Sequence, residues 1–233
     1  MFWMPWLVAL TALSCRPAPE GDDAARARER EQMVARQIAA RGVRDERTLA
    51  AMRKVPRHLF VPPEAARQAY ADHPLPIGHA QTISQPYIVG FMTEALALDG
   101  DETVLEVGTG SGYQAAVLAE IVSRVYTIEI VAPLAEEARA RLEDLGYSNV
   151  EVRAGDGYQG WPEAAPFDAI IVTAAAPRIP EPLKAQLREG GRLVLPVGDD
   201  WQELVVVTRK GDRFKEKRVL PVRFVPMTGE VRH

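Results

Sequence analysis

Three alternate glycines near the middle of the chain follow an apolar run and are preceded by an acid. The glycines are Gly108, Gly110 and Gly112, and the acid is Glu106, two residues before the first glycine. Glycine permits a left-handed backbone and close approach to a ligand, and the N–H groups of a following helix face that ligand. The pattern predicts a strand, a tight turn and a helix, with a nucleotide-like ligand bound at the turn.

Spacing and charge indicate which ligand the turn would bind. Dinucleotide sites have the spacing Gly-x-Gly-x-x-Gly, whereas a single residue separates each pair of glycines here. A carboxylate at Glu106 would repel a pyrophosphate, but it would attract the ammonium and sulfonium groups of S-adenosylmethionine. The acid therefore favours S-adenosylmethionine over a nicotinamide dinucleotide as the cofactor.

Two further acids support a nucleoside site. Glu129 ends the β-rich run 124–129 and lies 129 − 108 = 21 residues beyond Gly108, near the spacing of about 20 at which such sites place a ribose-binding acid. Asp156 stands between two glycines, the second of which is Gly157. Its carboxylate could accept a hydrogen bond from an adenine amino group, or the segment could be a plain turn.

Segment 81–86 carries two hydroxyls and two amides beside a proline, directly before a predicted helix over 87–98. Ser84 could be the N-cap of that helix, with Pro86 in its first turn. A cap would explain one hydroxyl but not the whole group. Capping and contact with a substrate are therefore equally open for Ser84.

Composition excludes several other classes of site. The chain has 28 Lys and Arg against 32 Asp and Glu, so its formal charge of −4 disfavours nucleic acid as a partner. A single cysteine, Cys15, rules out an intramolecular disulfide and a cysteine-rich metal site. The four histidines have no spacing typical of metal ligands, so we expect no metal.

The elements that would position these residues alternate along the chain. Such alternation predicts an α/β fold with a doubly wound, mostly parallel sheet, whose ligands bind beyond the carboxyl ends of the strands. The predicted helices are 113–122, 132–145 and 181–188, and the predicted strands are 124–129, 149–153, 167–173 and 191–197.

Two flanking regions complete the predicted fold. N-terminal helices over 24–41 and 45–55 are expected to cap the edge of the sheet, and 74–78 is expected to be extended. Segments 204–210 and 214–224 flank a Gly-Asp pair and predict an antiparallel C-terminal hairpin.

Residues 1–15 are apolar and give way to a polar stretch, which predicts a leader and linker over 1–23 and a single domain over 24–233. A small residue before Cys15 resembles the end of a lipoprotein signal, but no Lys or Arg precedes the apolar run. S-adenosylmethionine is made in the cytosol. We therefore expect a cytoplasmic protein, with export or lipid anchoring through Cys15 as the alternative.

Taken together, the motifs resemble those of the protein-L-isoaspartate O-methyltransferases over roughly 33–229. The first and last of the matching segments are peculiar to that family among methyltransferases. The segments are 81–86, 104–113, 155–157, 190–198 and 222–229.

The resemblance implies methylation of the free carboxyl group of L-isoaspartyl residues in damaged proteins, with S-adenosylmethionine as methyl donor. The ester then closes to a succinimide, whose hydrolysis regenerates some normal aspartate. By this resemblance Ser84 is the active-site residue, and the other matching positions divide between acceptor and cofactor. Acceptor contacts are implied for Thr82, Ile83, Tyr87 and Thr228, where Tyr87 replaces a histidine of some members; cofactor contacts are implied for Glu106, Gly108, Gly110, Gly112, Glu129, Asp156 and Gly157.

Such chemistry agrees with the scarcity of strong bases and metal ligands. A sulfonium is an activated methyl donor and a carboxylate is already ionised at neutral pH, so catalysis would be mainly alignment. Three other functions would share part of the pattern. A small-molecule methyltransferase would not need segments 81–86 and 222–229, a dehydrogenase is opposed by Glu106, and a binding module would hold the cofactor without transferring methyl groups.

Overall fold

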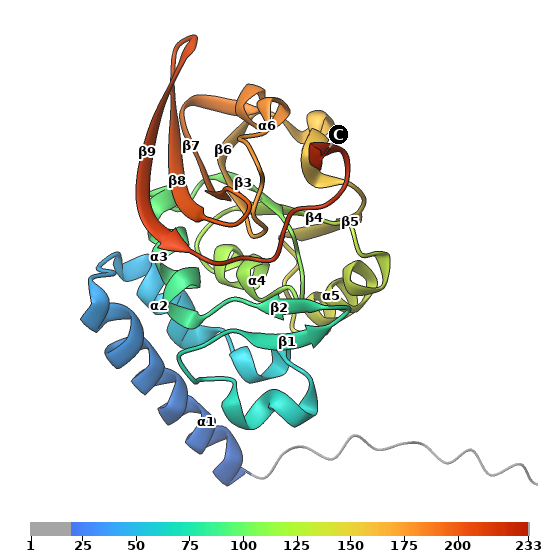
Figure 1. The fold of residues 1–233 in the computed structure, drawn as a ribbon. Helices are drawn as coiled ribbons and strands as arrows, with labels where there is room; N and C mark the ends of the chain where they lie inside the picture. Colours follow the sequence, from blue (N-terminus) through green and yellow to red (C-terminus); the bar gives the residue numbers. More distant parts are fainter. Residues whose placement is uncertain (1–19, 233) are drawn as a thin grey trace, which may run out of the picture.

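The computed structural model describes residues 20–232, in which a seven-stranded sheet lies between helices (Figure 1). The strands of this sheet are β3 (Thr103–Val107), β4 (Arg124–Glu129), β5 (Val150–Ala154), β6 (Phe167–Val172), β7 (Leu187–Val197), β8 (Gln202–Lys210) and β9 (Arg213–Val222). Their order is β5-β4-β3-β6-β7-β8-β9, with parallel pairing from β5 to β7 and antiparallel pairing from β7 to β9. The predicted parallel sheet and C-terminal hairpin are confirmed.

Side chains on successive strand residues enter two separate cores, one on each face of the sheet. On β3, Val104 belongs to one core and Leu105 to the other, as the period of two in a strand requires. The first core includes buried residues of α2 (Glu46–Lys54), α3 (Pro86–Leu96) and α4 (Tyr113–Ala119). The two faces are thus both covered, in agreement with the doubly wound prediction.

The second face has a thinner cover. Its core contains Leu183 of the five-residue helix α6 (Glu181–Ala185), together with Trp161. Met227 and Val231, near the end of the described chain, are buried in the same core. The segment after β9 therefore replaces a helix on this face.

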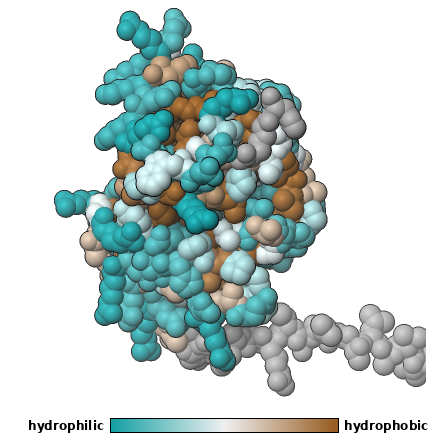
Figure 2. Space-filling model, in the orientation of Figure 1, coloured by the Kyte–Doolittle hydropathy of each residue, from teal (hydrophilic) through white to brown (hydrophobic). Residues whose placement is uncertain are grey.

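The N-terminal helices are an outer layer and do not cap the sheet edge as expected. Helix α1 (Glu20–Met33) continues through a π-helical turn, η1 (Val34–Ile38), and a 3₁₀ turn, η2 (Ala39–Arg41). The turn η1 packs on α3, and α2 packs on both α3 and α4, because their apolar stripe needs an apolar partner. The outward surface around α1 is hydrophilic (Figure 2).

Several predicted boundaries are wrong. The predicted helices 113–122 and 181–188 end earlier, at Ala119 and Ala185, and β7 begins at Leu187 instead of 191. Leu187 pairs with Phe167 of β6, a distant partner that overrides any local helix preference. Helix α5 (Ala132–Asp144) has nearly its predicted length.

The extended segment 74–78 is the strand β1 (Leu75–Gly78), and its partner was not predicted. It pairs antiparallel with β2 (Gln81–Ile83) in a separate two-stranded sheet. The intervening turn places His79 and Ala80 at φ of 50° and 56°, a left-handed conformation that non-glycine residues rarely adopt. β2 leads directly to Ser84 and so carries the predicted acceptor segment.

The predicted leader over 1–15, including Cys15, lies outside the described residues. Helix α1 begins at Glu20, within the predicted linker. Among the helices of the described part, none combines the length and the apolar character needed to cross a membrane.

Candidate active site

The glycine turn has the predicted strand, turn and helix. β3 ends at Val107, and Gly108, Gly110 and Gly112 follow with φ of 99°, 52° and 87° before α4 begins. A Cβ on Gly108 would lie 2.4 Å from the hydroxyl oxygen of Thr173, which donates a 2.6 Å hydrogen bond to the Gly108 carbonyl. Only glycine permits both this backbone angle and this contact.

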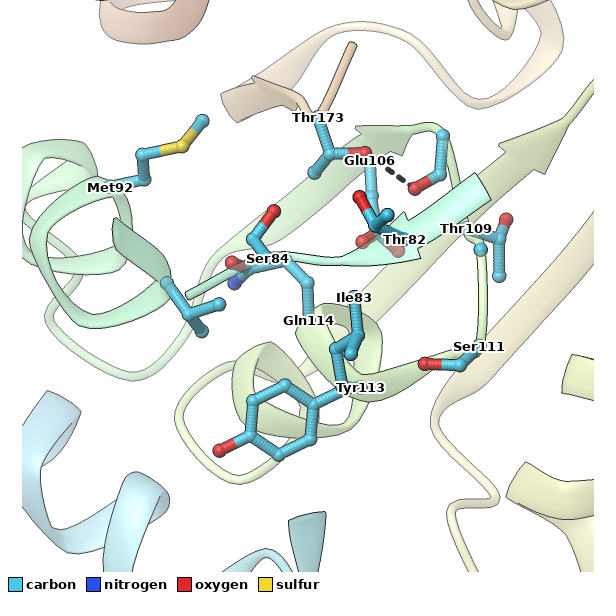
Figure 3. A pocket seen from close by; sticks show the side chains of 13 residues that line it. Thr82, Ile83, Ser84, Met92, Glu106, Thr109, Ser111, Tyr113, Gln114 and Thr173 are labelled. Atoms are coloured by element: carbon cyan, nitrogen blue, oxygen red, sulfur yellow. Dashed lines mark hydrogen bonds between the residues drawn. The ribbon is translucent and has the colours of Figure 1, made fainter. Parts of the chain in front are cut away.

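Two adjoining cavities flank the turn and share Thr82, Gly108, Gly110 and Thr173. The first, here the Glu106 cavity, is shown in Figure 3. The second is here the Glu129 cavity. The Glu106 cavity is lined by Thr82, Ile83, Ser84, Val89, Met92, Glu106, Gly108, Thr109, Gly110, Ser111, Tyr113, Gln114 and Thr173; the Glu129 cavity is lined by Gln81, Thr82, Val107, Gly108, Gly110, Ile128, Glu129, Ile130, Gly157, Thr173, Ala174, Val225, Pro226, Met227 and Thr228.

Glu106 is completely buried, and only one of its carboxyl oxygens is satisfied. Thr127 donates a 2.6 Å hydrogen bond to Oε2, and the hydroxyls of Thr127 and Thr109 are 2.6 Å apart. Oε1 has no hydrogen-bond partner among the described residues. Burial, with a smaller contribution from the nearby Glu129, raises the pKa of Glu106 to about 8.

Burial changes the expected charge of Glu106. The sequence predicts an ionised carboxylate at this position, whereas burial keeps the carboxyl group largely protonated near neutral pH. A cationic group placed at Oε1 would stabilise the ionised form. An orphaned acceptor beside an open glycine turn therefore fits the cationic methionine part of S-adenosylmethionine.

Glu129 is also buried, but both of its oxygens have partners. Oε2 accepts a 2.8 Å hydrogen bond from the Gly110 N–H, and Oε1 accepts a 2.9 Å bond from the Val131 N–H. The carboxylate thus holds the glycine turn in place. It still faces the second cavity beside the half-exposed Ile130, and each oxygen keeps a lone pair that a ribose hydroxyl could use.

Gly157 and Asp156 have different positions. Gly157 lines the Glu129 cavity, and a Cβ there would lie 2.3 Å from Cγ1 of Val107. Asp156 is not among the residues that line either cavity. Its Oδ1 accepts a hydrogen bond from the Tyr158 N–H, and its Oδ2 accepts one of 2.7 Å from the Glu230 N–H. Asp156 therefore fastens the segment that follows β9.

The structure excludes one of the two explanations of Ser84. The N-cap of α3 is Gln85, and no side chain caps this helix. The Ser84 hydroxyl has no hydrogen-bond partner among the described residues, and the residue lines the Glu106 cavity (Figure 3). Capping is therefore wrong, and a hydroxyl free to meet a ligand is left.

The other predicted acceptor residues are dispersed. Thr82 lies between the cavities, Ile83 lines the Glu106 cavity, and Thr228 lines the Glu129 cavity. Tyr87 lines neither of them. It is 8 % exposed, and the Arg41 guanidinium carbon lies 3.6 Å from the centre of its ring.

Gly112 is also away from both cavities. It is the N-cap of α4, and a Cβ there would lie 3.2 Å from Cδ1 of Leu142 on α5. Its predicted contact with the cofactor is thus not visible in the cavity walls. The position instead requires glycine for packing between two helices.

Sequence reasoning missed several polar residues of the Glu106 cavity. Thr173 follows β6 at the carboxyl edge of the sheet, a position that could have indicated a ligand contact. Ser111 and Gln114 lie in and just after the glycine turn. In the part of the chain that the structure describes, no group of three or more His, Cys, Asp or Glu side chains could hold a metal.

The segment after β9 closes the Glu129 cavity. Met227 N–H donates to the Ala175 carbonyl at 2.7 Å, and Ala175 N–H donates to the Val225 carbonyl at 2.8 Å. The side-chain amide of Gln202 donates to the Phe224 carbonyl and accepts from its N–H. These bonds explain how residues 225–228, distant in sequence from the glycine turn, form one wall of its cavity.

Comparison with known proteins agrees with this geometry. The family model described as protein-L-isoaspartate(D-aspartate) O-methyltransferase (PCMT) matches residues 28–232. A protein-L-isoaspartate O-methyltransferase of Opitutus terrae is 60% identical over 208 residues, covering 88% of this chain and 89% of the relative. Protein-L-isoaspartate O-methyltransferase 2 of Shewanella sediminis is 53% identical over 231 residues, covering 98% and 95%.

Solved structures show the same similarity. A protein-L-isoaspartate O-methyltransferase superposes with a TM-score of 0.80 at 30% identity, covering 87% of this chain and 67% of that protein. A Plasmodium falciparum structure described as a putative enzyme of this kind, in complex with S-adenosyl-L-homocysteine, has a TM-score of 0.75 at 26% identity. It matches over 85% of this chain and 98% of its own.

Proposed function

The chain belongs to the protein-L-isoaspartate(D-aspartate) O-methyltransferase family, and from that premise we propose how its residues divide the work. It is an S-adenosylmethionine-dependent carboxyl O-methyltransferase, whose acceptor is the free carboxyl group of isoaspartyl residues in damaged proteins. The observation that carries the division of roles is the presence of Ser84 and Glu106 on one cavity.

The cofactor site spans both cavities. When bound, S-adenosylmethionine supplies a methyl group activated by its sulfonium. Glu106, with Gly108 and Gly110, would hold the cationic methionine part, because Oε1 is an acceptor that has no partner within the described part of the chain. Glu129 would hold the ribose in the second cavity, and Gly157 would lie at the adenine end.

Asp156 and Gly112 would support the cofactor indirectly. The Asp156 carboxylate holds Glu230 and so keeps the segment after β9 against the Glu129 cavity. Direct contact of Asp156 with adenine would need its remaining lone pairs. Gly112 allows α4 to start close to α5, which fixes the end of the glycine turn.

The acceptor would enter beside Ser84. A carboxylic acid with a pKa near 4 is ionised at neutral pH, so no general base is needed. The Ser84 hydroxyl would donate a hydrogen bond to the carboxylate and orient it, without acting as a nucleophile. Thr82, Ile83 and Thr228 would hold the surrounding peptide, whereas the burial of Tyr87 beneath Arg41 places it behind this surface.

Methylation would begin repair. The carbonyl carbon of the methyl ester is a better electrophile than that of the carboxylate, and its methoxy group can leave as methanol. The neighbouring backbone nitrogen therefore attacks this carbon, forms the new C–N bond, expels methanol and closes a succinimide. Hydrolysis of the succinimide then gives some normal aspartate. The partners would be aged proteins and peptides, and a cytoplasmic location would follow from where the cofactor is made.

Residues 24–233 would form one domain. The support is that β3, β4, β6, β7 and β8 each contribute buried residues to both cores, so neither face of the sheet can be separated from the other. A role for Cys15 in anchoring lies outside the described residues.

The test compares labelled methyl transfer from S-adenosylmethionine to paired peptides, one with L-isoaspartate and one with aspartate at the same position. We expect label on the isoaspartyl peptide alone, and loss of most label with Ser84→Ala. Label on neither peptide, with the cofactor still bound, would contradict the proposed acceptor. Label on small carboxylic acids but not on peptides would favour a small-molecule methyltransferase.

A further inference from the structure

A fully buried arginine lies directly behind the proposed acceptor site. Arg57 begins the 3₁₀ turn η3 (Arg57–Phe60) and is 0% exposed. Its Nη2 donates a 2.7 Å hydrogen bond to the carbonyl of Ser84, and its Nε donates a 2.7 Å bond to the carbonyl of Ala69. The guanidinium carbon lies 4.8 Å from the ring centre of Tyr113, the first residue of α4. One side chain thus links the acceptor segment to the helix after the glycine turn.

The charge of Arg57 has no carboxylate partner among the described residues. Its Nε and Nη2 groups donate to two neutral carbonyls, and Nη1 is buried without a hydrogen-bond partner in the described chain. Buried arginines are normally paired with an acid, because an uncompensated charge is costly to bury. A link needed only for packing could use a neutral donor. This unpaired cation therefore contacts the backbone of Ser84, the residue whose hydroxyl lines the Glu106 cavity.

We propose that Arg57 is a positioning residue for methyl transfer, which fixes the Ser84 backbone and whose positive charge favours the acceptor carboxylate at the Ser84 hydroxyl. This inference rests on the proposed role of Ser84. The acceptor is an anion, and an anion at Ser84 would lie within several ångströms of the guanidinium. At such a distance in partly buried surroundings an opposite charge changes affinity by about tenfold or more.

A second arginine offers a matched comparison on the cofactor side. Arg141 of α5 donates a 2.8 Å hydrogen bond from Nη1 to the carbonyl of Ser111 in the glycine turn. Its guanidinium, like that of Arg57, holds a backbone carbonyl next to the cavity. Because Ser111 belongs to the cofactor turn and Ser84 to the acceptor segment, the two arginines should affect different ligands.

The experiment measures three variants, Arg57→Met, Arg57→Lys and Arg141→Met, in the full chain. Calorimetry gives the Kd for S-adenosylhomocysteine, and steady-state kinetics give kcat and KM for an isoaspartyl peptide. For Arg57→Met we expect a KM for the peptide at least about tenfold higher and a lower kcat, with the Kd within twofold of the wild type. Arg57→Lys keeps the charge and should recover part of the KM, which a purely structural role would not produce. Arg141→Met should raise the Kd more than the KM.

An Arg57→Met protein that binds S-adenosylhomocysteine normally and keeps wild-type kcat and KM would overturn the inference. If this variant does not fold, Arg57→Lys decides: normal Kd with a raised peptide KM supports the proposal, and unchanged kinetics contradict it. A wild-type protein that methylates neither peptide would refute the proposed function together with this inference. If the wild-type protein methylates the isoaspartyl peptide and the Arg57 variants have the same kinetics, only the positioning role of Arg57 is refuted.

Discussion

Glu106 and Glu129 stand at the ends of neighbouring strands, one in each cavity, and their carboxyl groups have opposite surroundings. Both oxygens of Glu129 accept backbone N–H groups, one of them from the glycine turn itself. Among the residues that the structure describes, Glu106 has a single donor, Thr127, and a buried oxygen with none. A carboxylate satisfied by fixed backbone donors holds a structure together, whereas one left unsatisfied is prepared for a charge that arrives later.

Replacing Glu129, whose two carboxylate oxygens both have partners, should have the largest effect on ligand binding. Glu129→Ala loses two charge-assisted hydrogen bonds, one from the glycine turn and one from Val131, together with any bond to the ribose, each worth roughly 1.5–3 kcal/mol. We expect the affinity for S-adenosylhomocysteine, measured by calorimetry, to fall by about 100-fold. Glu136→Ala, which loses an exposed acid of α5 paired with Arg139, should bind normally. Wild-type affinity in Glu129→Ala would contradict the role of Glu129 in holding the glycine turn and the ribose.

Removing the Ser84 hydroxyl in the Glu106 cavity should have the next largest effect, and this effect should concern the acceptor peptide instead of the cofactor. Ser84→Ala removes a donor to a charged acceptor, so kcat/KM for the isoaspartyl peptide should fall by roughly 10- to 100-fold. The Kd for S-adenosylhomocysteine should stay within twofold. Ser148→Ala, an exposed serine between α5 and β5, is the control. A collapse of cofactor affinity in Ser84→Ala would assign this residue a structural role instead.

The unsatisfied carboxyl group should make cofactor binding depend on pH. In the free protein the pKa of Glu106 is about 8, so below pH 8 a cationic ligand must displace a proton to gain an ionised partner. Affinity for S-adenosylmethionine should therefore rise by up to about tenfold per pH unit from pH 6.5 to 7.5 and level off above 8. Calorimetry in buffers of different ionisation heat would detect the released proton.

The same pKa sets the sign of a stability effect. Unfolded, the carboxyl ionises near 4.5, and folded it ionises near 8. Between these values the folded protein holds a proton that the unfolded chain has lost, so the contribution of Glu106 to stability falls as pH rises through this window. Glu106→Gln should flatten both pH profiles, and a retained slope would assign it to another group.

The smallest expected effect concerns Asp156, whose carboxylate fastens Glu230. Asp156→Asn weakens that hydrogen bond by about 1 kcal/mol, so proteolysis within the segment after β9 should accelerate about fivefold. Asp212→Asn, at the exposed tip of the β8–β9 hairpin, should be cleaved at the wild-type rate. Unaltered proteolysis together with weaker cofactor binding would instead support direct contact of Asp156 with adenine.

The fold was predictable where its signals are local. The apolar run of β3, the alternate glycines and the later alternation of elements required no knowledge of distant residues. The pairing of β1 with β2 was missed because it requires His79 and Ala80 in a left-handed turn that their residue types do not indicate. Leu187 was assigned to a helix because its partner, Phe167, is 20 residues away.

The residues of the candidate site were likewise predictable only where their signals are local. Glycines and acids have recognisable spacing, so Gly108, Glu106 and Glu129 were found from the sequence alone. Their electrostatic states were not, because the burial of Glu106 depends on Thr127 and on the neighbouring strands. Arg57 gave no signal, since its contact with the Ser84 carbonyl spans 27 residues.

The wall that residues 225–228 add to the Glu129 cavity also sets an order in time. This segment leaves the ribosome after all seven strands have been made, and domains fold as their chain emerges. The sheet and the glycine turn can therefore assemble while the cavity still lacks one side. A nascent chain would complete its cofactor site only once residues 225–228 have emerged and the Met227 N–H reaches the carbonyl of Ala175.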